Sequence, residues 1–285
     1  MEPATERRGS IIIMNKAICK FIKKGAETFS LRLLVLICFI MLAAPVLAIT
    51  GEQIISKVDD NMTFDSARME AEMVIHVGDQ VRTKTMVSYS QGRDKSFSEF
   101  LSPPRDKGVK YLKIEDNMWM YLPSVDKIIK IAGHMLRQSM MGSDFSYEDA
   151  LESSKLLEKY DVGLVTEEIT YVKIKKGTEE VTKGRPCYVL ALTAKVKDVT
   201  YYKRKIWVDR EIFVPVKEEL FAKSGKKLKV TMLGDVRKYG SRYYPTYISM
   251  QNLLRSDSLT EMVVTKAQFG IRIPKDTFTQ RNLKK

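Results

Sequence analysis

The sequence has few of the residues on which catalytic and metal sites most often depend. Among 285 residues there are only three cysteines, two histidines and two tryptophans. Cys19 and Cys38 fall in an N-terminal segment that we expect to be removed, so the mature chain keeps only Cys187 and cannot contain an internal disulfide or a cysteine-based metal site. His76 and His134 have no partner at a metal-ligand or nucleophile-base spacing. The sequence therefore predicts no metal, no cofactor and no catalytic residues, and it disfavours an enzyme.

Long apolar runs are also scarce, and the one run that could enter a bilayer lies near the start of the chain. Residues 33–42 read LLVLICFIML, with basic residues before them and the segment AAPVLA after them, where Val46 and Ala48 are small residues at −3 and −1. This is the pattern of a secretory signal peptide. We expect residues 1–48 to be a signal peptide that is cleaved after Ala48, and residues 49–285 to be exported as one large domain or two small ones.

Two alternatives remain open for this segment. Residues 33–49 carry no charge over 17 positions, which is the lower limit for a spanning helix, so an uncleaved anchor is the rival interpretation. Met14 could be the true initiator, because MNKAICKFIKK already supplies the basic region that a signal peptide needs. A lipoprotein is not expected, since position 49 is Ile rather than the cysteine that would be acylated.

Charge of one sign does not dominate the chain. There are 48 Lys and Arg against 35 Asp and Glu, a formal net charge of +13, and this mixed basic surface could steer the protein to anionic membranes or to an exporter. The run from Tyr201 to Lys205 interleaves aromatics with cations, as single-stranded nucleic-acid platforms do. Residues of a strand alternate between faces, however, and export removes most nucleic-acid partners. We therefore expect no nucleic-acid binding. We expect this run to place its cations on the solvated outer face and to pack its aromatics inward.

Alternation with a period of two dominates the mature chain. Between residues 67 and 77, apolar residues that include Met69, Met73 and Ile75 share one face, and mostly charged residues occupy the other. Similar segments follow along the chain, and the turns between them are too short for parallel crossovers. We count about thirteen candidate strands and trust about ten or eleven of them. The pattern predicts a mainly β fold, an antiparallel meander that curls into a sandwich or a barrel.

Helices are expected at two places. Thr50 and Gln53 fit a capping box that opens a helix over residues 51–60. Ser146 and Asp149 are a candidate cap for a second short helix in a segment that interrupts the strands. The C-terminal KDTFTQRNLKK predicts no more than a last half-turn or a frayed coil.

The segment that interrupts the strands is also rich in methionine and acidic residues. Five methionines fall between positions 118 and 141, and flexible thioethers suit a surface that must accept varied apolar shapes, although a packed core is the alternative. The carboxylates of Asp144, Glu148 and Asp149 could bind a cation or act as an acid and base pair. Their spacing does not match a calcium loop, and we favour helix capping and loop hydrogen bonding.

Two motifs resemble a known family. The segment from Trp119 to Pro123, WMYLP, is followed by VDKIIKI and resembles the W-x-Y-x-P segment of the LolA/LolB superfamily of periplasmic lipoprotein carriers. The run over residues 140–149, MMGSDFSYED, is similar to a hallmark of the branch described as outer membrane lipoprotein-sorting proteins, which is often associated with RND-type exporters. The late KAQFGIRIPKDTF is similar to the closing segment of the family. The resemblance covers most of the mature chain, and it implies that residues 49–285 form a single lipid-binding domain.

The resemblance implies a strongly curved antiparallel sheet, an incomplete barrel, with a few helices over its concave face. It implies that a cavity on this face binds lipid or lipoprotein acyl chains, and that the protein is a monomeric periplasmic carrier that moves them across the envelope. No clear counterpart of the family's functional cavity arginine is present, and Arg105 is the candidate by neighbourhood. A non-transporting accessory or scaffold of an RND-type exporter or envelope complex is the main alternative, and an envelope hydrolase is the third.

Two groups of site residues follow from the motifs and the strand pattern. We predict a cavity lined by apolar and aromatic side chains, with plain core packing as the alternative for those on strands: Met69, Met73, Ile75, Trp119, Tyr121, Met140, Met141 and Phe145. We predict a second group that anchors the helical insert or docks a partner: Asp144, Tyr147, Glu148 and Asp149.

Overall fold

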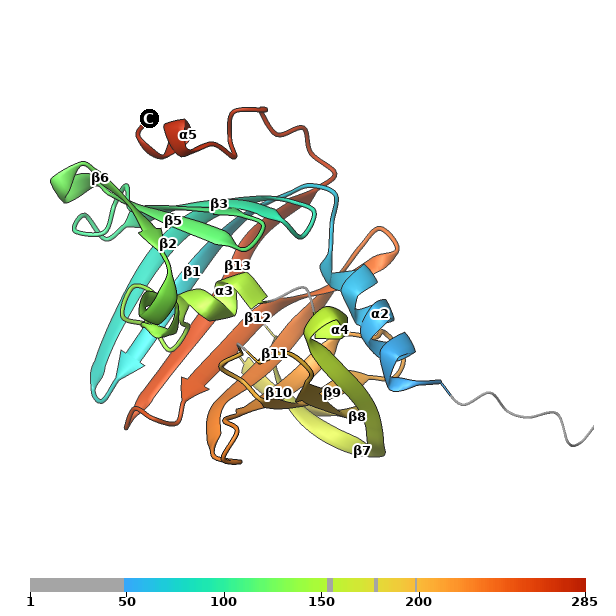
Figure 1. Ribbon diagram of the computed structural model, residues 1–285. Helices are drawn as coiled ribbons and strands as arrows, with labels where there is room; N and C mark the ends of the chain where they lie inside the picture. Colours follow the sequence, from blue (N-terminus) through green and yellow to red (C-terminus); the bar gives the residue numbers. More distant parts are fainter. Residues whose placement is uncertain (1–48, 153–155, 177–178, 198) are drawn as a thin grey trace, which may run out of the picture. The chain divides into compact units, whose positions relative to one another are not determined.

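The computed structural model describes residues 49–152, 156–176, 179–197 and 199–285. These residues belong to one compact unit, Ile49–Lys285, and the predicted signal peptide lies outside them. Thirteen strands pair in one antiparallel sheet with the order β6-β5-β4-β3-β2-β1-β13-β12-β11-β10-β9-β8-β7 (Figure 1). The mainly β, antiparallel fold predicted from the sequence is confirmed, and all thirteen candidate segments contribute, rather than ten or eleven.

The strands follow the chain with short connections. The first six are β1 (Ala67–Val77), β2 (Gln80–Gln91), β3 (Lys95–Ser102), β4 (Lys110–Ile114), β5 (Asn117–Leu122) and β6 (Lys127–Ile131). The other seven are β7 (Tyr160–Lys176), β8 (Glu179–Ala194), β9 (Lys203–Asp209), β10 (Pro215–Phe221), β11 (Lys227–Tyr239), β12 (Arg242–Asn252) and β13 (Ser258–Phe269). Because β6 and β7 end the order without pairing to each other among the described strands, the sheet is an open, incomplete barrel.

The sheet curls because its strands are irregular at several places. Register shifts interrupt the pairing of β1 with β13, of β2 with β3, of β9 with β10, of β10 with β11 and of β7 with β8. Each such bulge bends its strand and increases the local twist. Figure 1 shows the result: the sheet bends so that β2–β6 and β9–β12 lie on opposite sides of its concave face, with α3 between them.

Helices are few and short. The described residues form α2 (Gly51–Met62), α3 (Tyr147–Glu152), α4 (Leu156–Lys159) and α5 (Gln280–Leu283), with short 3-10 helices η1 (Pro123–Val125) and η2 (Gly133–Arg137). The predicted capping box is confirmed, because the Thr50 hydroxyl accepts from the Gln53 backbone and the Gln53 side chain accepts from the Thr50 backbone. Among the described residues, no helix combines the length and the apolar character that crossing a membrane requires.

The concave face carries two separate apolar clusters. The first, which we call the filled side, lies inside β1 and β3–β6 and consists of Met73, Ile75, Phe100, Val109, Tyr111, Met118, Met120, Ile131 and Tyr147. The second, which we call the open side, lies between α2 and the strands β7–β9. It consists of Ile54, Ile55, Val58, Tyr160, Leu190, Leu192, Ile206 and Val208. Ile54, Ile55 and Val58 form the apolar stripe of the amphipathic helix α2, and this stripe completes the open side.

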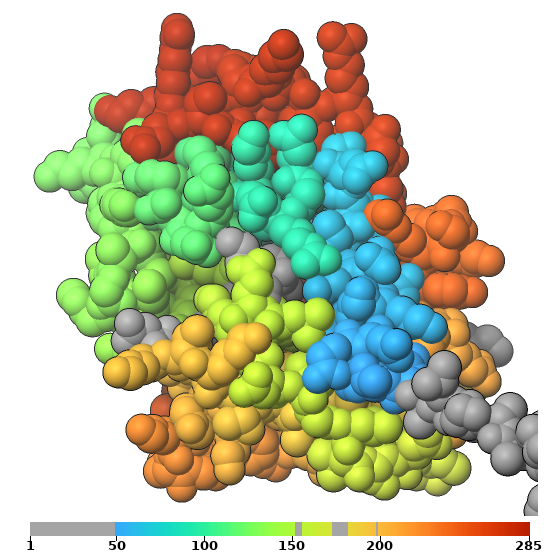
Figure 2. Space-filling view, turned by 45° about the vertical axis from the view of Figure 1, so that its right-hand side comes forward, coloured from blue at the N-terminus to red at the C-terminus, as the bar shows by residue number. Residues whose placement is uncertain are grey.

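The C-terminal segment covers the opposite, outer face of the sheet. Phe278 and Leu283 pack there on Phe97 and Leu112, which point away from the filled side. Figure 2 shows this segment, in red, lying along the outside of the green and blue-green strands. The sequence analysis expected the helices to cover the concave face, but α5 lies on the outer face. There Leu283 of α5 and the preceding Phe278 bury their large apolar side chains.

Candidate functional site

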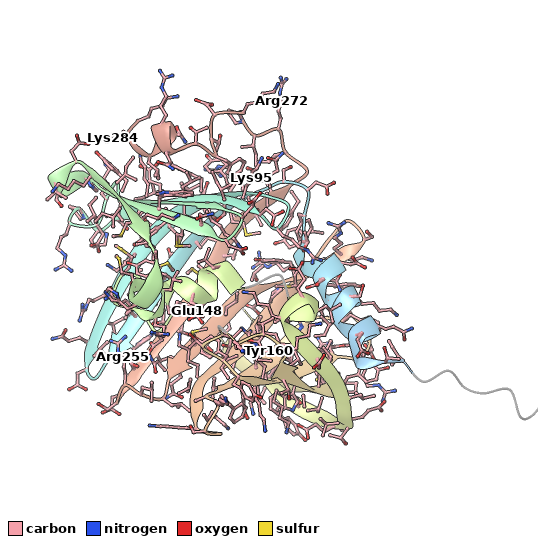
Figure 3. The ribbon with its side chains drawn as sticks, viewed as in Figure 1. Lys95, Glu148, Tyr160, Arg255, Arg272 and Lys284 are labelled. Atoms are coloured by element: carbon pink, nitrogen blue, oxygen red, sulfur yellow. The ribbon has the colours of Figure 1, made fainter. Side chains whose placement is uncertain are left out.

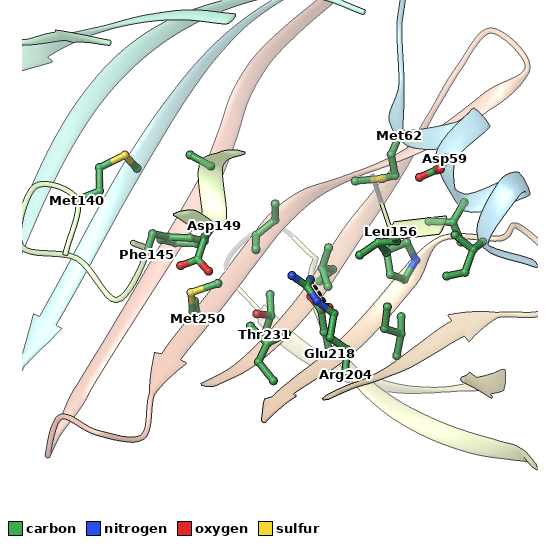
Figure 4. Close-up of a pocket in the computed structure, with 18 residues that line it drawn as sticks. Asp59, Met62, Met140, Phe145, Asp149, Leu156, Arg204, Glu218, Thr231 and Met250 are labelled. Carbon is green, nitrogen blue, oxygen red and sulfur yellow. Dashed lines mark hydrogen bonds and ion pairs between the residues drawn. The ribbon is translucent and has the colours of Figure 1, made fainter. Parts of the chain in front are cut away.

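A pocket of about 320 Å³ lies on the open side of the concave face (Figure 4). Its floor is formed by residues that cross-strand pairing places on one face: Arg204 and Ile206 of β9, Glu218 and Leu220 of β10, Thr231 and Leu233 of β11, and Ile248 and Met250 of β12. Because side chains two apart share a face, this set alternates with residues that point outward. The floor is mainly apolar, and its polar members are few.

The roof of the pocket comes from three helices and the loop before α3. Ile55, Val58, Asp59 and Met62 of α2 line one wall, and Leu156 of α4 lies near them. The other wall is made by Met140 and Phe145 of the loop and by Asp149 and Ala150 of α3. The pocket is therefore bounded by α2 on one side and by the segment from η2 to α3 on the other.

We call residues 133–152, from η2 to α3, the insert. Its loop turns back on itself at Gly142, whose φ of +80° favours glycine, so that the Met140 backbone N–H donates to the Phe145 carbonyl at 2.8 Å. Ser139 and Ser146 form an isolated bridge beside it. This turn brings both Met140 and Phe145 to the pocket.

Asp144 fixes the insert to the middle of the sheet, at β12 and β13. Its carboxylate is buried and accepts hydrogen bonds from the Ser258 hydroxyl at 2.5 Å and the Thr260 hydroxyl at 2.8 Å, both on β13. The backbone N–H of Asn252 donates to it at 3.3 Å. The buried carboxylate therefore accepts several hydrogen bonds, and removing their donors would leave it unsatisfied at a cost in stability.

Asp149 fixes α3 to the neighbouring strand β11 and to Tyr201, which precedes β9. Its carboxylate pairs with Lys229 of β11 at 2.5 Å, and it accepts from the Tyr201 hydroxyl at 2.7 Å. It also accepts from the Ser146 backbone N–H at 2.6 Å, while the Ser146 hydroxyl accepts from the Asp149 N–H, so these two residues cap the start of α3. Burial raises the pKa of Tyr201, and the Asp149 carboxylate beside it adds to that effect, so the phenol stays protonated and donates.

The remaining insert contacts face the filled side and the space between the two sides. The Tyr147 ring lies 5.9 Å from the Tyr111 ring, and its hydroxyl donates to the Met120 sulfur. Lys113 donates to the Leu151 carbonyl at 3.1 Å, near the end of α3. Glu148, which Figure 3 places between the two sides, accepts from the Thr200 hydroxyl. The acidic cluster is thus occupied by structural hydrogen bonds.

A charged pair lies in the pocket floor. The Arg204 guanidinium donates to Glu218 at 3.0 Å, and its carbon lies 5.0 Å from the Tyr160 ring centroid and 5.3 Å from that of Tyr201. Arg204 is only 8 % exposed. Sequence reasoning missed this arginine, because the alternation of residues 201–205 was taken to leave the cations outside. The register of β9 with β10 pairs Arg204 with Leu220 and Ile206 with Glu218, so these residues share the inward face and Glu218 is a diagonal neighbour of Arg204.

The predicted cavity residues are distributed over four places. Met140 and Phe145 line the pocket. Met73 and Ile75 belong to the filled side, and Met141 packs against it. Met69 is half-buried near the start of β1, outside the residues that line the pocket.

Trp119 and Tyr121 lie on the outer face rather than in the hollow. They pack against the cluster that contains Phe278 and Leu283, whereas Met118 and Met120, which alternate with them on β5, face inward. Arg105, the candidate cavity arginine, has an 83 % exposed side chain. The W-x-Y-x-P segment thus contributes its methionines, and not its aromatics, to the concave face.

Comparisons with known proteins agree with this architecture. A family model described as that of an uncharacterized protein matches residues 92–285, more than half of the chain. The chain belongs to this family. None of the curated proteins matches it.

Three solved structures share most of the fold. A domain assigned to the outer membrane lipoprotein-sorting proteins, from Vibrio parahaemolyticus, is 22% identical with a TM-score of 0.72, over 82% of this chain and 98% of that one. A DUF1329 family protein from Desulfovibrio piger is 24% identical with a TM-score of 0.73, over 82% and 97%. A LolA superfamily protein from Nitrosomonas europaea is 23% identical with a TM-score of 0.65, over 82% and 100%. The resemblance stated from the sequence motifs is therefore confirmed at the level of the fold, which is similar to that of these three proteins.

Proposed function

We propose that the protein is a periplasmic carrier that binds lipid or lipoprotein acyl chains in the open-side pocket and moves them across the envelope. The observation that carries the proposal is the pocket of about 320 Å³ between α2 and β9–β12, with mainly apolar lining. Moving an acyl chain from water into an apolar pocket is favourable by about 0.8 kcal/mol for each CH₂ group that is buried. An apolar hollow of this kind can therefore hold such a chain. The signal peptide predicted for residues 1–48 would export the protein, which we expect to act as a monomer.

The size of the pocket limits what it can hold at one time. Its volume is at the lower end of the range for ligand pockets, about 300–1,000 Å³, which suits one chain of medium length. A cargo with several chains would need more space. The insert is the part that could give way, since Met140, Phe145 and Ala150 line the pocket from it, and the methionine can repack around different tails.

A second candidate function is that of an accessory protein of an RND-type exporter or envelope complex. The observation that favours it is the edge strand β7, on which Val165, Ile169 and Tyr171 are exposed. An unpaired edge with apolar side chains is a place where another chain can add a strand. This function would require a persistent protein partner and would not require an occupied pocket.

The proposed carrier function is tested by binding a fluorescent fatty acyl probe to residues 49–285. Ile248→Trp places a larger side chain in the pocket floor, and we expect it to abolish probe uptake. Val263→Trp on the neighbouring strand is the matched control, because Val263 pairs with Tyr247 and so lies on the opposite face. Native mass spectrometry of the wild type should also show co-purified lipid. A lipid-free species that refuses the probe would contradict the proposal.

A further inference from the structure

The pocket floor contains a polar group whose hydrogen bonding is incomplete. The Thr231 hydroxyl has no hydrogen-bond partner among the residues that the structure describes, and the side chain is only 6 % exposed. It lines the pocket between its cross-strand neighbours Glu218 and Met250 (Figure 4). Buried hydroxyls are normally paired, so an unpaired one that faces a cavity is an unused donor and acceptor.

The charges around the pocket are already balanced. Arg204 pairs with Glu218 in the floor, at 3.0 Å. Lys229 pairs with Asp149 at the insert wall, at 2.5 Å. In the wall formed by α2, Asp59 pairs with Arg93 at 3.2 Å. Each carboxylate of the lining thus has its own cation.

We propose that the pocket selects acyl compounds with a neutral, hydrogen-bonding head, such as the ester of an acylglycerol, over free fatty acids, and that Thr231 is the residue that binds this head. The inference rests on the proposed carrier function and names its class of ligand. The hydroxyl would donate to an ester carbonyl oxygen, or accept from a head-group hydroxyl, and either contact would satisfy it. The apolar lining would then hold the chain.

A free fatty acid is disfavoured by the same charge balance. Its carboxylate is ionised at neutral pH and would enter a buried site without a spare cation, which is expensive. The Arg204 guanidinium already pairs with Glu218 at 3.0 Å, so an acid carboxylate bound there would lie beside the Glu218 carboxylate and be repelled by it. A neutral ester breaks no ion pair. The discrimination therefore comes from the cost of binding the acid as much as from the hydrogen bond to the ester.

The test compares two ligands with the same chain, 1-decanoylglycerol and decanoate, by isothermal titration at neutral pH and below their aggregation limits. We expect the wild-type protein to bind the acylglycerol about tenfold more tightly than the acid. Thr231→Val should weaken binding of the acylglycerol by about fivefold or more, and should leave the weak binding of decanoate unchanged within about twofold. Thr231→Ser, which keeps the hydroxyl, should retain the wild-type preference.

Two controls separate selectivity from folding and from the carrier function. Thr193→Val, at an exposed position on β8, should change neither affinity. The thermal midpoint of Thr231→Val should not fall, because the substitution removes a buried unpaired hydroxyl. The inference is overturned if the wild type binds decanoate at least as tightly as 1-decanoylglycerol, or if Thr231→Val keeps the full preference for the acylglycerol. Either result leaves the carrier function standing. A wild type that binds neither ligand overturns both.

Discussion

The filled and open sides belong to the same concave face, yet only the open side contains the pocket. On the filled side, Tyr147 of α3 reaches Tyr111 and Met120 and closes the interior. Toward the open side, the same short helix presents Asp149 and Ala150, a charged group held by Lys229 and a methyl group. The difference teaches that the curved sheet alone does not decide where a hollow lies. The side chains of the insert decide it, by filling one side and stopping short of the other.

The largest expected effect comes from releasing the insert. Lys229→Met leaves the Asp149 carboxylate buried without its cation, and we expect a loss of about 3–5 kcal/mol in the free energy of unfolding, measured by urea denaturation. Lys284→Met is the matched control, because its ion pair with Asp126 is exposed, and it should cost less than about 1 kcal/mol. A loss at Lys229 as small as that of the control would mean that this pair does not hold α3 in place.

A pair of methionines tests the contrast between the two sides more finely. Met73 is fully buried on the filled side, and Met73→Ala should cost about 3 kcal/mol because it opens a new cavity. Met250 lines the existing pocket, where part of its surface has no packing partner, so Met250→Ala should cost about 1 kcal/mol. Both values come from chemical denaturation under the same conditions. Equal costs would indicate that the open side is as tightly packed as the filled side.

The smallest expected effect is on the pH dependence of stability. Burial raises the pKa of Asp59, and the charge of Arg93 offsets this only in part. Because the folded state holds this proton more tightly, the contribution to stability is full below the unfolded pKa of about 4 and is lost as the pH rises through the folded pKa. Asp59→Asn cannot titrate, so its thermal midpoint should decline less between about pH 4 and pH 7.

The control for this titration is Asp79→Asn, at an exposed turn between β1 and β2. It should leave the wild-type slope of thermal midpoint against pH unchanged. If Asp59→Asn and Asp79→Asn give the same slope, the α2 wall of the pocket is more open to water than its burial indicates.

Much of the fold could be predicted from local patterns. The period of two between residues 67 and 77 placed Met73 and Ile75 inside, and the Thr50 and Gln53 capping box set the start of α2. The cap formed by Ser146 and Asp149 was equally local. These features depend on residues close in the chain, which is why a sequence can reveal them.

The parts that could not be predicted depend on contacts between distant residues. In residues 118–122 both faces are apolar, and only the packing of Phe278 and Leu283 shows that Trp119 and Tyr121 belong outside. Arg204 shares the inward face with Leu220, its partner on the next strand, and strand register is not written in either segment alone. The pocket itself depends on how closely α2 and the insert approach the sheet.

The most direct test of the central claim is a crystal structure of residues 49–285 with a bromine-labelled decanoylglycerol, read from the anomalous signal of the bromine. We predict one strong peak in the open-side pocket, beside Leu233 and Ile248, with the head group beside Thr231. A bromine peak on the outer face or along the β7 edge, with the pocket closed by its own side chains, would contradict the account.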